Sequence, residues 1–314
     1  FRASGFQPAR CTGRGVQALG ADAEKTCVNR SFLFVPADSD RKLAKAAGAG
    51  ADALILDLED AVAPEARPAA RANAADYAKD KEDVWVRINP FDSEDALADL
   101  EAVMPAAPCG IVLPKPRSAA DAIALSRRID VLEHELDIEA GRTRIIALCT
   151  EQPEALFTLN AYAGATERLY GLSWGAEDLS AAVGASTNRD PQGNWLPLYE
   201  MARSFCLLAA AAAEVTALDT VFTDFRDEKG LLRYAANARR DGFSGMLAIH
   251  PAQIEVINSA FSPSAAEIEQ AQRIVALFEE NPGAGTVGLD GRMIDRPHLV
   301  QAQRILTMSQ RPKN

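Results

Sequence analysis

The sequence predicts a (β/α)8 barrel followed by a smaller helical and hairpin extension. Short apolar runs rich in β-branched residues recur along the chain, an Ala-rich amphipathic stretch follows each of them, and polar residues gather where the runs end. Alternating strands and helices indicate a parallel sheet, and eight such units indicate a closed barrel. The 314 residues accommodate one barrel and an appendage.

The expected strands are short, and a helical pattern follows each one. We expect the strands at residues 31–36, 53–58, 84–89, 110–115, 144–150, 169–174, 216–222 and 245–250. We expect the helices at residues 40–48, 66–79, 94–103, 118–136, 152–162, 197–213, 228–240 and 251–260.

A doubly wound open sheet is the alternative fold for such a pattern. It would normally have fewer strands and a glycine-rich loop after the first strand. Here the first turn reads PADSDRK and contains no glycine, so the dinucleotide-binding fingerprint is absent.

The two ends of the chain differ from the repeating region. Residues 1–29 show no periodicity, and we expect a vector-derived remnant or a mobile arm there. The barrel is expected over residues 30–262. Residues 263–314 read as a helix (263–280), a Gly/Pro-rich break, a hairpin with Asp-Gly at its turn (286–295) and a last helix (297–309). This extension is too small for a second core, so we expect a lid or a subunit contact.

Composition excludes several classes of partner. The net charge of −11 argues against binding to nucleic acid, which normally requires a basic surface. No apolar run approaches the 18 residues that indicate a membrane span. The five cysteines are odd in number and lack CxxC spacing, so we expect free thiols, buried in the case of Cys109 and Cys149, and a reducing, cytoplasmic compartment.

Polar residues follow nearly every predicted strand. They are Asp38, Asp57, Glu59, Asp60, Arg87, Asn89, Lys115, Glu151, Glu177, Asp178 and His250. The chemistry of barrel enzymes gathers at the carboxyl ends of the strands. Strand alternation puts Asp57 on one side with Ile55 and Glu59, Arg87 with Trp85 and Asn89, and Glu151 with Ala147 and Cys149. If these sides face the barrel axis, the charged groups converge on one cavity.

Converging carboxylates indicate a hard divalent cation such as Mg²⁺, Ca²⁺ or Mn²⁺. The histidines, His134, His250 and His298, are too scattered for a zinc site. His134 is expected at the surface, and His250 fits either a structural hydrogen bond or a general base. No GxSxG elbow supports a serine hydrolase.

Several motifs taken together resemble one known family. They are RSFLFVPADSDRKLAKA, LILDLEDAVAP, WVRINPFD, IVLPKP, LCTEQPEAL, GLSWGAEDLSAAVG, MLAIHPAQI and GRMIDRPHL. In this order they resemble the citrate lyase beta subunit-like family, which includes malyl-CoA and citramalyl-CoA lyases, over residues 30–309. The resemblance implies a Mg²⁺-dependent barrel enzyme, with Mn²⁺ as the alternative metal. Such an enzyme reversibly cleaves a 3-hydroxyacyl-CoA, such as malyl-, citramalyl- or citryl-CoA, to an acyl-CoA and a 2-oxo acid.

The resemblance also implies roles for individual residues. Glu151 and Asp178 match the metal ligands, and Arg87 matches the arginine that binds the oxo-acid carboxylate. Asp295 matches a catalytic aspartate that reaches the active site of an adjacent subunit in a trimer. The positions that contact CoA or substrate are Phe34, Lys45, Gly175 and Ala176. One departure is Ser39, where some malyl-CoA lyases have arginine, although Arg41 and Lys42 lie close by in the sequence.

The acidic run LILDLEDAV is expected to support this site without ligating the metal. Asp57 and Glu59 would accept hydrogen bonds from metal-bound water and orient Arg87 and Lys115. Asp60 is expected to have a structural role in the turn that follows the strand.

Some alternatives stay open at this point. Arg87 could only pair with Asp57 or Glu59, Lys115 could only support the acidic rim, and Asp295 could only cap a helix. The loop 184–196, with Asn194 and Trp195, could shape a substrate or subunit contact or be structural. The alternative functions are a malyl-CoA thioesterase, a beta subunit inside a citrate lyase complex and an aldolase that acts on small acids without CoA. The expected partners are a CoA ester and a 2-oxo acid, and the expected assembly is a homotrimer or a multiple of it.

Overall fold

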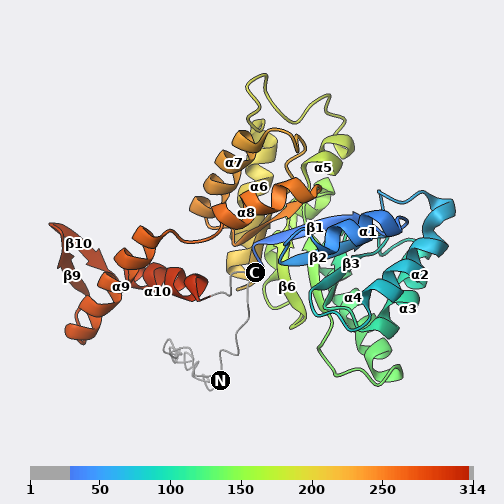
Figure 1. Cartoon of the computed structure of the whole chain (residues 1–314), viewed down its shortest axis with the longest axis horizontal. Helices are drawn as coiled ribbons and strands as arrows, with labels where there is room; N and C mark the ends of the chain where they lie inside the picture. Colours follow the sequence, from blue (N-terminus) through green and yellow to red (C-terminus); the bar gives the residue numbers. More distant parts are fainter. Residues whose placement is uncertain (1–28, 311–314) are drawn as a thin grey trace, which may run out of the picture.

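Eight parallel strands close into a barrel in the computed structural model, which describes residues 29–310 (Figure 1). Each strand pairs with the next along the chain, and the eighth pairs with the first. The strands are β1 (Ser31–Pro36), β2 (Ala53–Asp57), β3 (Val84–Arg87), β4 (Gly110–Leu113), β5 (Arg144–Leu148), β6 (Leu169–Ser173), β7 (Thr216–Asp219) and β8 (Gly245–Ala248). The predicted fold class is therefore confirmed. The expectation of an N-terminal arm concerns residues 1–29, of which residues 1–28 lie outside the part of the chain that the structure describes.

All eight predicted strands exist, but every strand after β1 ends earlier than expected. The difference is one to three residues, and it moves most of the predicted strand-end polar residues into the loops that follow. Asp57 and Arg87 are the exceptions, because each is the last residue of its strand.

Helices surround the barrel (Figure 1). The α-helices are α1 (Asp40–Ala47), α2 (Arg67–Ala78), α3 (Glu94–Val103), α4 (Ala119–Glu135), α5 (Ala176–Ala182), α6 (Pro197–Ala212), α7 (Glu228–Asp241) and α8 (Ile254–Ala260). Short 3-10 segments are η1 (Pro64–Ala66), η2 (Met104–Ala106), η3 (Pro153–Phe157), η4 (Leu159–Tyr162) and η5 (Pro251–Gln253).

Two helices differ from expectation. The helix predicted over 152–162 is instead the pair η3 and η4, because Thr158 between them has φ −127° and ψ 11°, which is not helical. Helix α5 was not predicted, since it follows β6 directly and is short.

Apolar side chains fill the interior of the barrel near the amino ends of the strands. The inner cluster consists of Phe32, Ala53, Ile55, Trp85, Val112, Ile146, Leu148, Leu218 and Leu247. Trp85 packs against Phe32 and Tyr170, with ring centroids 5.9 Å and 5.1 Å away. Gly110 makes room for this indole, because a Cβ there would lie 2.2 Å from the ring. The interior is therefore closed near the amino ends of the strands.

Strand β5 corrects one expectation. Its inward side chains are Ile146 and Leu148, whereas Ala147 and Cys149 belong to the cluster between strands and helices. Glu151 comes three residues after the end of β5, so the alternation of the strand does not determine its direction.

The C-terminal extension forms a separate layer of structure that projects from the barrel (Figure 1). It contains α9 (Ala265–Glu280), the antiparallel pair β9 (Thr286–Leu289) and β10 (Arg292–Asp295), and α10 (Arg296–Ser309). The predicted hairpin and helices are present. Contrary to expectation, the extension has a small core, made of Ala271, Ile274, Leu289, Ile294 and Ala302. Its function as a lid or subunit contact stays a prediction.

Among residues 29–310, no helix has the length and apolar character needed to cross a membrane.

Candidate active site

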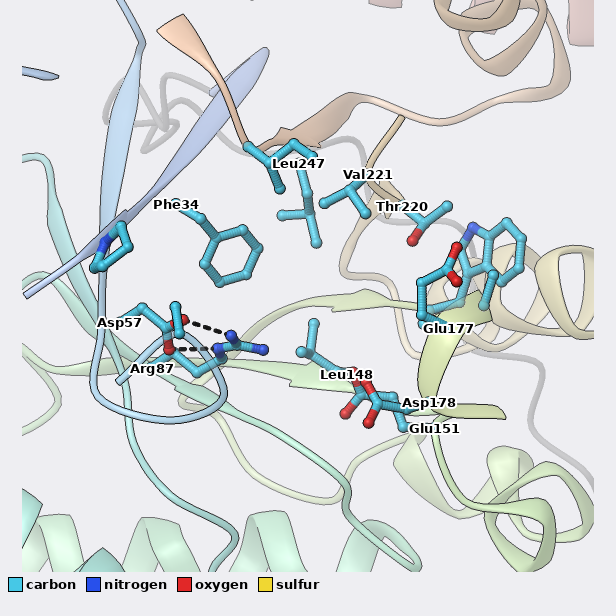
Figure 2. Close-up of a pocket in the computed structure, with 16 residues that line it drawn as sticks. Phe34, Asp57, Arg87, Leu148, Glu151, Glu177, Asp178, Thr220, Val221 and Leu247 are labelled. Atoms are coloured by element: carbon cyan, nitrogen blue, oxygen red, sulfur yellow. Dashed lines mark hydrogen bonds and ion pairs between the residues drawn. The ribbon is translucent and has the colours of Figure 1, made fainter. Parts of the chain in front are cut away.

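A cavity of about 330 Å³ opens at the carboxyl ends of the barrel strands (Figure 2). It is lined by Phe34, Pro36, Asp57, Ala61, Arg87, Leu148, Glu151, Trp174, Gly175, Ala176, Glu177, Asp178, Thr220, Val221, Leu247 and Ile249. This is the end of the barrel where the sequence predicts the chemistry.

Arg87 stands on one side of the cavity and is held by two carboxylates. Its Nε and Nη2 donate to the two oxygens of Asp57 at 2.7 Å and 2.6 Å, and its Nη1 lies 2.9 Å from Glu59 Oε2. Although burial disfavours the cation, Asp57 and Glu59 hold the pKa of Arg87 above its usual value. In Figure 2, the nitrogen that is not bonded to Asp57 points away from that carboxylate. The pairing that was left open for Arg87 is thus present, and it orients the guanidinium.

Lys115 joins the acidic groups across the rim. Its Nζ lies 2.5 Å from Glu59 Oε1, 2.9 Å from Asp60 Oδ2 and 3.2 Å from Asp178 Oδ1. Burial disfavours the ammonium, but Glu59 and Asp60 outweigh this and raise the pKa of Lys115. Burial raises the pKa of Glu59, although Arg87 and Lys115 oppose that shift. The repulsion among the carboxylates of LILDLEDAV is therefore offset by one arginine and one lysine.

Glu151 is almost completely buried at the base of the cavity, with 3% of the residue exposed. The backbone N–H of Lys115 donates to its Oε2 at 2.6 Å. Gly175 allows the close approach of the loop after β6, because a Cβ there would lie 2.7 Å from Glu151 Oε1. Burial, Asp178 and Glu59 raise the pKa of Glu151 well above its usual value. A positive charge at this point would relieve that penalty.

The carboxylates of Glu151 and Asp178 overlap in the view of Figure 2, and the charge of Asp178 helps to raise the pKa of Glu151. Glu151 comes from the loop after β5 and Asp178 from the first turn of α5, and both line the cavity. Residues 29–310 contain no group of three or more His, Cys, Asp or Glu side chains that could hold a metal ion. A pair of carboxylates fits Mg²⁺, which typically takes one or two protein carboxylates and leaves its other positions to water and substrate. The donor set therefore fits a hard divalent cation and does not fit zinc.

The rest of the cavity wall is mostly apolar. The ring of Phe34 covers Arg87, with the guanidinium carbon 4.7 Å from the ring centroid. Leu148, Trp174 and Leu247 complete this wall. An apolar wall keeps the local dielectric constant low, which strengthens the electrostatic interactions of the charged groups.

Sequence reasoning missed the buried carboxylate of Asp219, at the end of β7. Its Oδ1 accepts hydrogen bonds from Trp174 Nε1 at 2.7 Å and from the hydroxyl of Tyr234 at 2.9 Å. Its Oδ2 accepts two from Arg203, at 3.0 Å and 2.8 Å. Asp219 thus holds the indole that forms one wall of the cavity. The sequence contains a signal for this residue, because Asp219 lies inside the apolar run TALDTVF just as Asp57 lies inside ALILDL.

Loop 184–196 supports the same wall. Trp195 packs edge to face on Trp174 at 5.1 Å, and its Nε1 donates to the hydroxyl of Tyr234 at 3.3 Å. Asn194 donates to Asp190 within the loop. Neither Asn194 nor Trp195 lines the cavity, so the structural interpretation of this pair is favoured over a substrate contact.

Of the remaining predicted site residues, two line the cavity and two do not. Gly175 and Ala176 line the cavity, whereas Lys45 is exposed in the last turn of α1 and does not. Asp295 ends β10 in the extension and caps α10, with its Oδ1 2.5 Å from His298 Nδ1. In Figure 1 this strand lies well away from the barrel of the same chain.

Two other predicted residues, Asn89 and His250, have structural partners. Asn89 bonds to Asp99 and to a backbone carbonyl, and it is not among the cavity-lining residues. His250 accepts a hydrogen bond from the backbone of Ala252 and caps η5, as the structural alternative predicts.

Of the described cysteines, Cys149 and Cys206 are buried and Cys109 is partly buried, and all three are free thiols.

Comparisons with known proteins agree with this architecture. The citrate lyase subunit beta of Haemophilus influenzae is 38% identical over 285 residues, which cover 89% of this chain and 96% of the relative. A (3S)-malyl-CoA thioesterase of Cereibacter sphaeroides is 36% identical over 289 residues, covering 90% of this chain and 94% of the relative.

Solved structures are similar as well. The crystal structure of CitE from Mycobacterium tuberculosis, in complex with magnesium, acetoacetate and coenzyme A, matches with a TM-score of 0.77 and 36% identity. The match covers 90% of this chain and 99% of that chain. Another structure from the same organism is a citrate lyase beta subunit complexed with oxaloacetate and magnesium. It matches with a TM-score of 0.65 and 37% identity, and the match covers 75% of this chain and 98% of that chain.

The profile of the family described as HpcH/HpaI aldolase/citrate lyase matches residues 30–251, which span the barrel and the cavity at its carboxyl end. The predicted resemblance and the predicted lyase class are confirmed at the level of the family. With its barrel, its cavity and these relatives taken together, the chain belongs to the HpcH/HpaI aldolase/citrate lyase family.

Proposed function

We propose that this protein is a Mg²⁺-dependent carbon–carbon lyase that acts on a 3-hydroxyacyl-CoA. It yields an acyl-CoA and a 2-oxo acid, and the reaction also runs as a Claisen-type condensation. The observation that carries this proposal is the pair Glu151 and Asp178 in one cavity with the guanidinium of Arg87. Structures of the CitE relative bind magnesium with acetoacetate, pyruvate or coenzyme A, which supports the same class of ligands here.

The bound metal supplies Lewis-acid polarisation of the oxo-acid carbonyl. Glu151 and Asp178 are the residues that would hold this metal. Arg87 contributes its N–H groups to the substrate carboxylate, and Asp57 and Glu59 keep the guanidinium in place for that contact.

Proton transfer needs a further group. Cleavage takes the proton from the 3-hydroxyl, breaks the carbon–carbon bond and releases the acyl thioester as an enolate, whose α-carbon must take up a proton. Condensation runs the same transfers in reverse. The carboxyl of Asp295, donated by the extension of a neighbouring subunit, is the proposed acid and base. Phe34, Leu148 and Trp174 restrict water around the reacting carbons.

The test is to incubate the purified protein with Mg²⁺ and with malyl-, citramalyl- or citryl-CoA, and to measure release of the 2-oxo acid. We expect release from at least one ester and its loss when EDTA is added. Release of free CoA without a 2-oxo acid would instead indicate a thioesterase, as the name of one relative suggests. Absence of any cleavage, with or without metal, contradicts the lyase. Activity of the chain alone on free CoA esters excludes a dependence on an acyl-carrier partner.

A further inference from the structure

Lys115 contacts both proposed metal ligands, Glu151 through its backbone and Asp178 through its side chain. Its backbone N–H donates to Glu151 Oε2 at 2.6 Å. Its Nζ lies 3.2 Å from Asp178 Oδ1. The residue has a left-handed backbone with φ +49° and lies between Pro114 and Pro116, so its position is set by the main chain. The side chain can therefore be changed without removing the bond to Glu151.

The ammonium of Lys115 has more than one anionic partner. Glu59 Oε1 at 2.5 Å and Asp60 Oδ2 at 2.9 Å also hold it, and its side chain is 20% exposed. Among residues 29–310, Lys115 is the cationic side chain that pairs with Asp178. Without a metal, this ammonium compensates the charge of a proposed ligand.

A divalent cation on Glu151 and Asp178 would lie close to the same ammonium. Two cations at that separation repel each other, and the repulsion is strong in a cavity with a low dielectric constant. Lys115 can give up Asp178 and keep its contacts with Glu59 and Asp60. Its charge therefore stabilises the site when metal is absent and opposes the metal when it binds.

We propose that Lys115 is a built-in counter-cation that competes with the divalent metal for Asp178. This inference rests on the proposed function through the assignment of Glu151 and Asp178 as ligands. It makes Lys115 a positioning residue that keeps the acidic site folded before the metal arrives and lowers the affinity for it.

The opposite interpretation is that Lys115 only supports the acidic rim. In that case its removal would loosen the ligands and weaken metal binding. The two interpretations predict changes of opposite sign in the dissociation constant of Mg²⁺, so one measurement separates them.

The experiment measures Mg²⁺ binding by isothermal titration calorimetry without substrate, and the melting temperature with EDTA and with saturating Mg²⁺. The variant is Lys115→Met, because Met is also unbranched and has a comparable cost in the left-handed region. We expect the Mg²⁺ dissociation constant to fall about fivefold or more, since a nearby like charge is removed. The melting temperature in EDTA should fall, and the increase caused by Mg²⁺ should become larger.

Two variants serve as controls. Lys115→Arg keeps the charge and should bind Mg²⁺ within about twofold of the unsubstituted protein, because the repulsion is kept. Lys79→Met makes the same change in net charge at an exposed ion pair with Asp76 and should leave the constant unchanged.

An unchanged or higher dissociation constant in a folded Lys115→Met protein overturns the inference. If that variant does not fold, Lys115→Asn replaces it, because Asn tolerates the left-handed backbone and carries no charge. Absence of Mg²⁺ binding by the unsubstituted protein overturns the inference together with the ligand assignment. Mg²⁺ binding that follows the expected pattern without any release of 2-oxo acid overturns only the proposed function.

Discussion

At the scale of single residues, Glu151 is the most constrained acid of the cavity. It is buried, it accepts one backbone N–H, and Gly175 packs directly against its carboxylate. The dipole of that N–H and the charge of Arg87 offset the negative charge only in part, because the pKa of Glu151 is still raised. A group in this situation gains most from a bound cation.

We expect Glu151→Gln to abolish detectable turnover and to weaken Mg²⁺ binding by a factor of about ten or more, since one anionic ligand is lost. Asp178→Asn should act in the same direction. Calorimetry with Mg²⁺ and the 2-oxo acid assay provide the readouts. Glu154→Gln is the matched control, because Glu154 is a nearby exposed glutamate whose side chain is 55% exposed. Retained metal-dependent turnover in Glu151→Gln would refute the ligand assignment.

The raised pKa of Glu151 has a consequence for metal binding. Burial is its largest cause, followed by Asp178 and Glu59, so the carboxyl holds its proton at a pH above the usual glutamate value of 4.5. The metal binds the deprotonated form, and binding therefore releases a proton. We expect the apparent Mg²⁺ affinity to fall, by up to about tenfold per unit, as the pH is lowered toward and through the raised pKa.

This dependence is measured by calorimetry between about pH 8 and about pH 5, a range in which an ordinary glutamate stays ionised. Repeating the titration in buffers of different ionisation enthalpy counts the released protons. An affinity that does not change over this range would show that Glu151 is already fully ionised in the metal-free protein.

At the scale of structural elements, the segment from β6 to α5 carries both a wall of the cavity and a proposed metal ligand. Trp174 comes directly after β6, and Asp178 lies four residues later in the first turn of α5. The bond from Trp174 Nε1 to Asp219 ties this segment to β7, and Arg203 ties Asp219 to α6. Tyr234 ties Asp219 to α7. Two surrounding helices, α6 and α7, thereby help to set the position of Asp178.

We expect Trp174→Phe, which keeps an aromatic ring but loses the N–H donor, to weaken Mg²⁺ binding by about tenfold, because outer partners orient metal ligands. Tyr234→Phe removes another hydrogen bond to the same oxygen of Asp219 without touching the cavity. It should cost about 1 kcal/mol of stability and leave the Mg²⁺ constant unchanged.

Thermal unfolding and Mg²⁺ calorimetry on both variants check this prediction. If the two variants lose stability and metal affinity in the same proportion, Asp219 has only a structural role. If Trp174→Phe binds Mg²⁺ normally, the segment is held by other contacts.

At the scale of the whole molecule, the extension separates Asp295 from the cavity of its own chain. The strand that ends at Asp295 lies in a layer with its own small core, away from the barrel (Figure 1). A catalytic role for Asp295 therefore calls for a second copy of the chain, as the family resemblance implies.

Co-expression of two inactive variants tests this arrangement. In Asp295→Asn the cavity keeps both proposed metal ligands, and in Glu151→Gln the extension keeps its carboxyl. If each site combines residues of two subunits, random mixing restores about a quarter of the sites. The assay is 2-oxo acid release by the co-purified mixture, with each variant alone as the control. Absence of restored activity in proven mixed oligomers places Asp295 in the same subunit as its site, and an active Asp295→Asn protein removes it from the reaction.

Much of the fold could be predicted from the sequence because its signals are local. The apolar runs and the amphipathic stretches between them determine eight strands and most helices through their periodicity. The Asp-Gly pair at 290–291 determines the hairpin turn, where both residues have positive φ. The polar rim follows from the order of the elements, since parallel strands end at one edge. Asp57 and Arg87 were predicted to lie together for this reason, and they do.

Tertiary structure decided which polar residues reach the cavity. Asn89 and Glu151 lie beyond the ends of their strands, so strand alternation does not determine where these side chains point. The ammonium of Lys115 meets Glu59 across 56 residues of sequence, and Trp174 meets Asp219 across 45. These contacts depend on the stagger of a closed barrel and on the loops above it, which join elements distant in the chain. The sequence by itself determined the barrel and the acidic character of its rim, whereas the pairing of each charge required the closed structure, because such pairing is set by geometry between elements and not by periodicity within them.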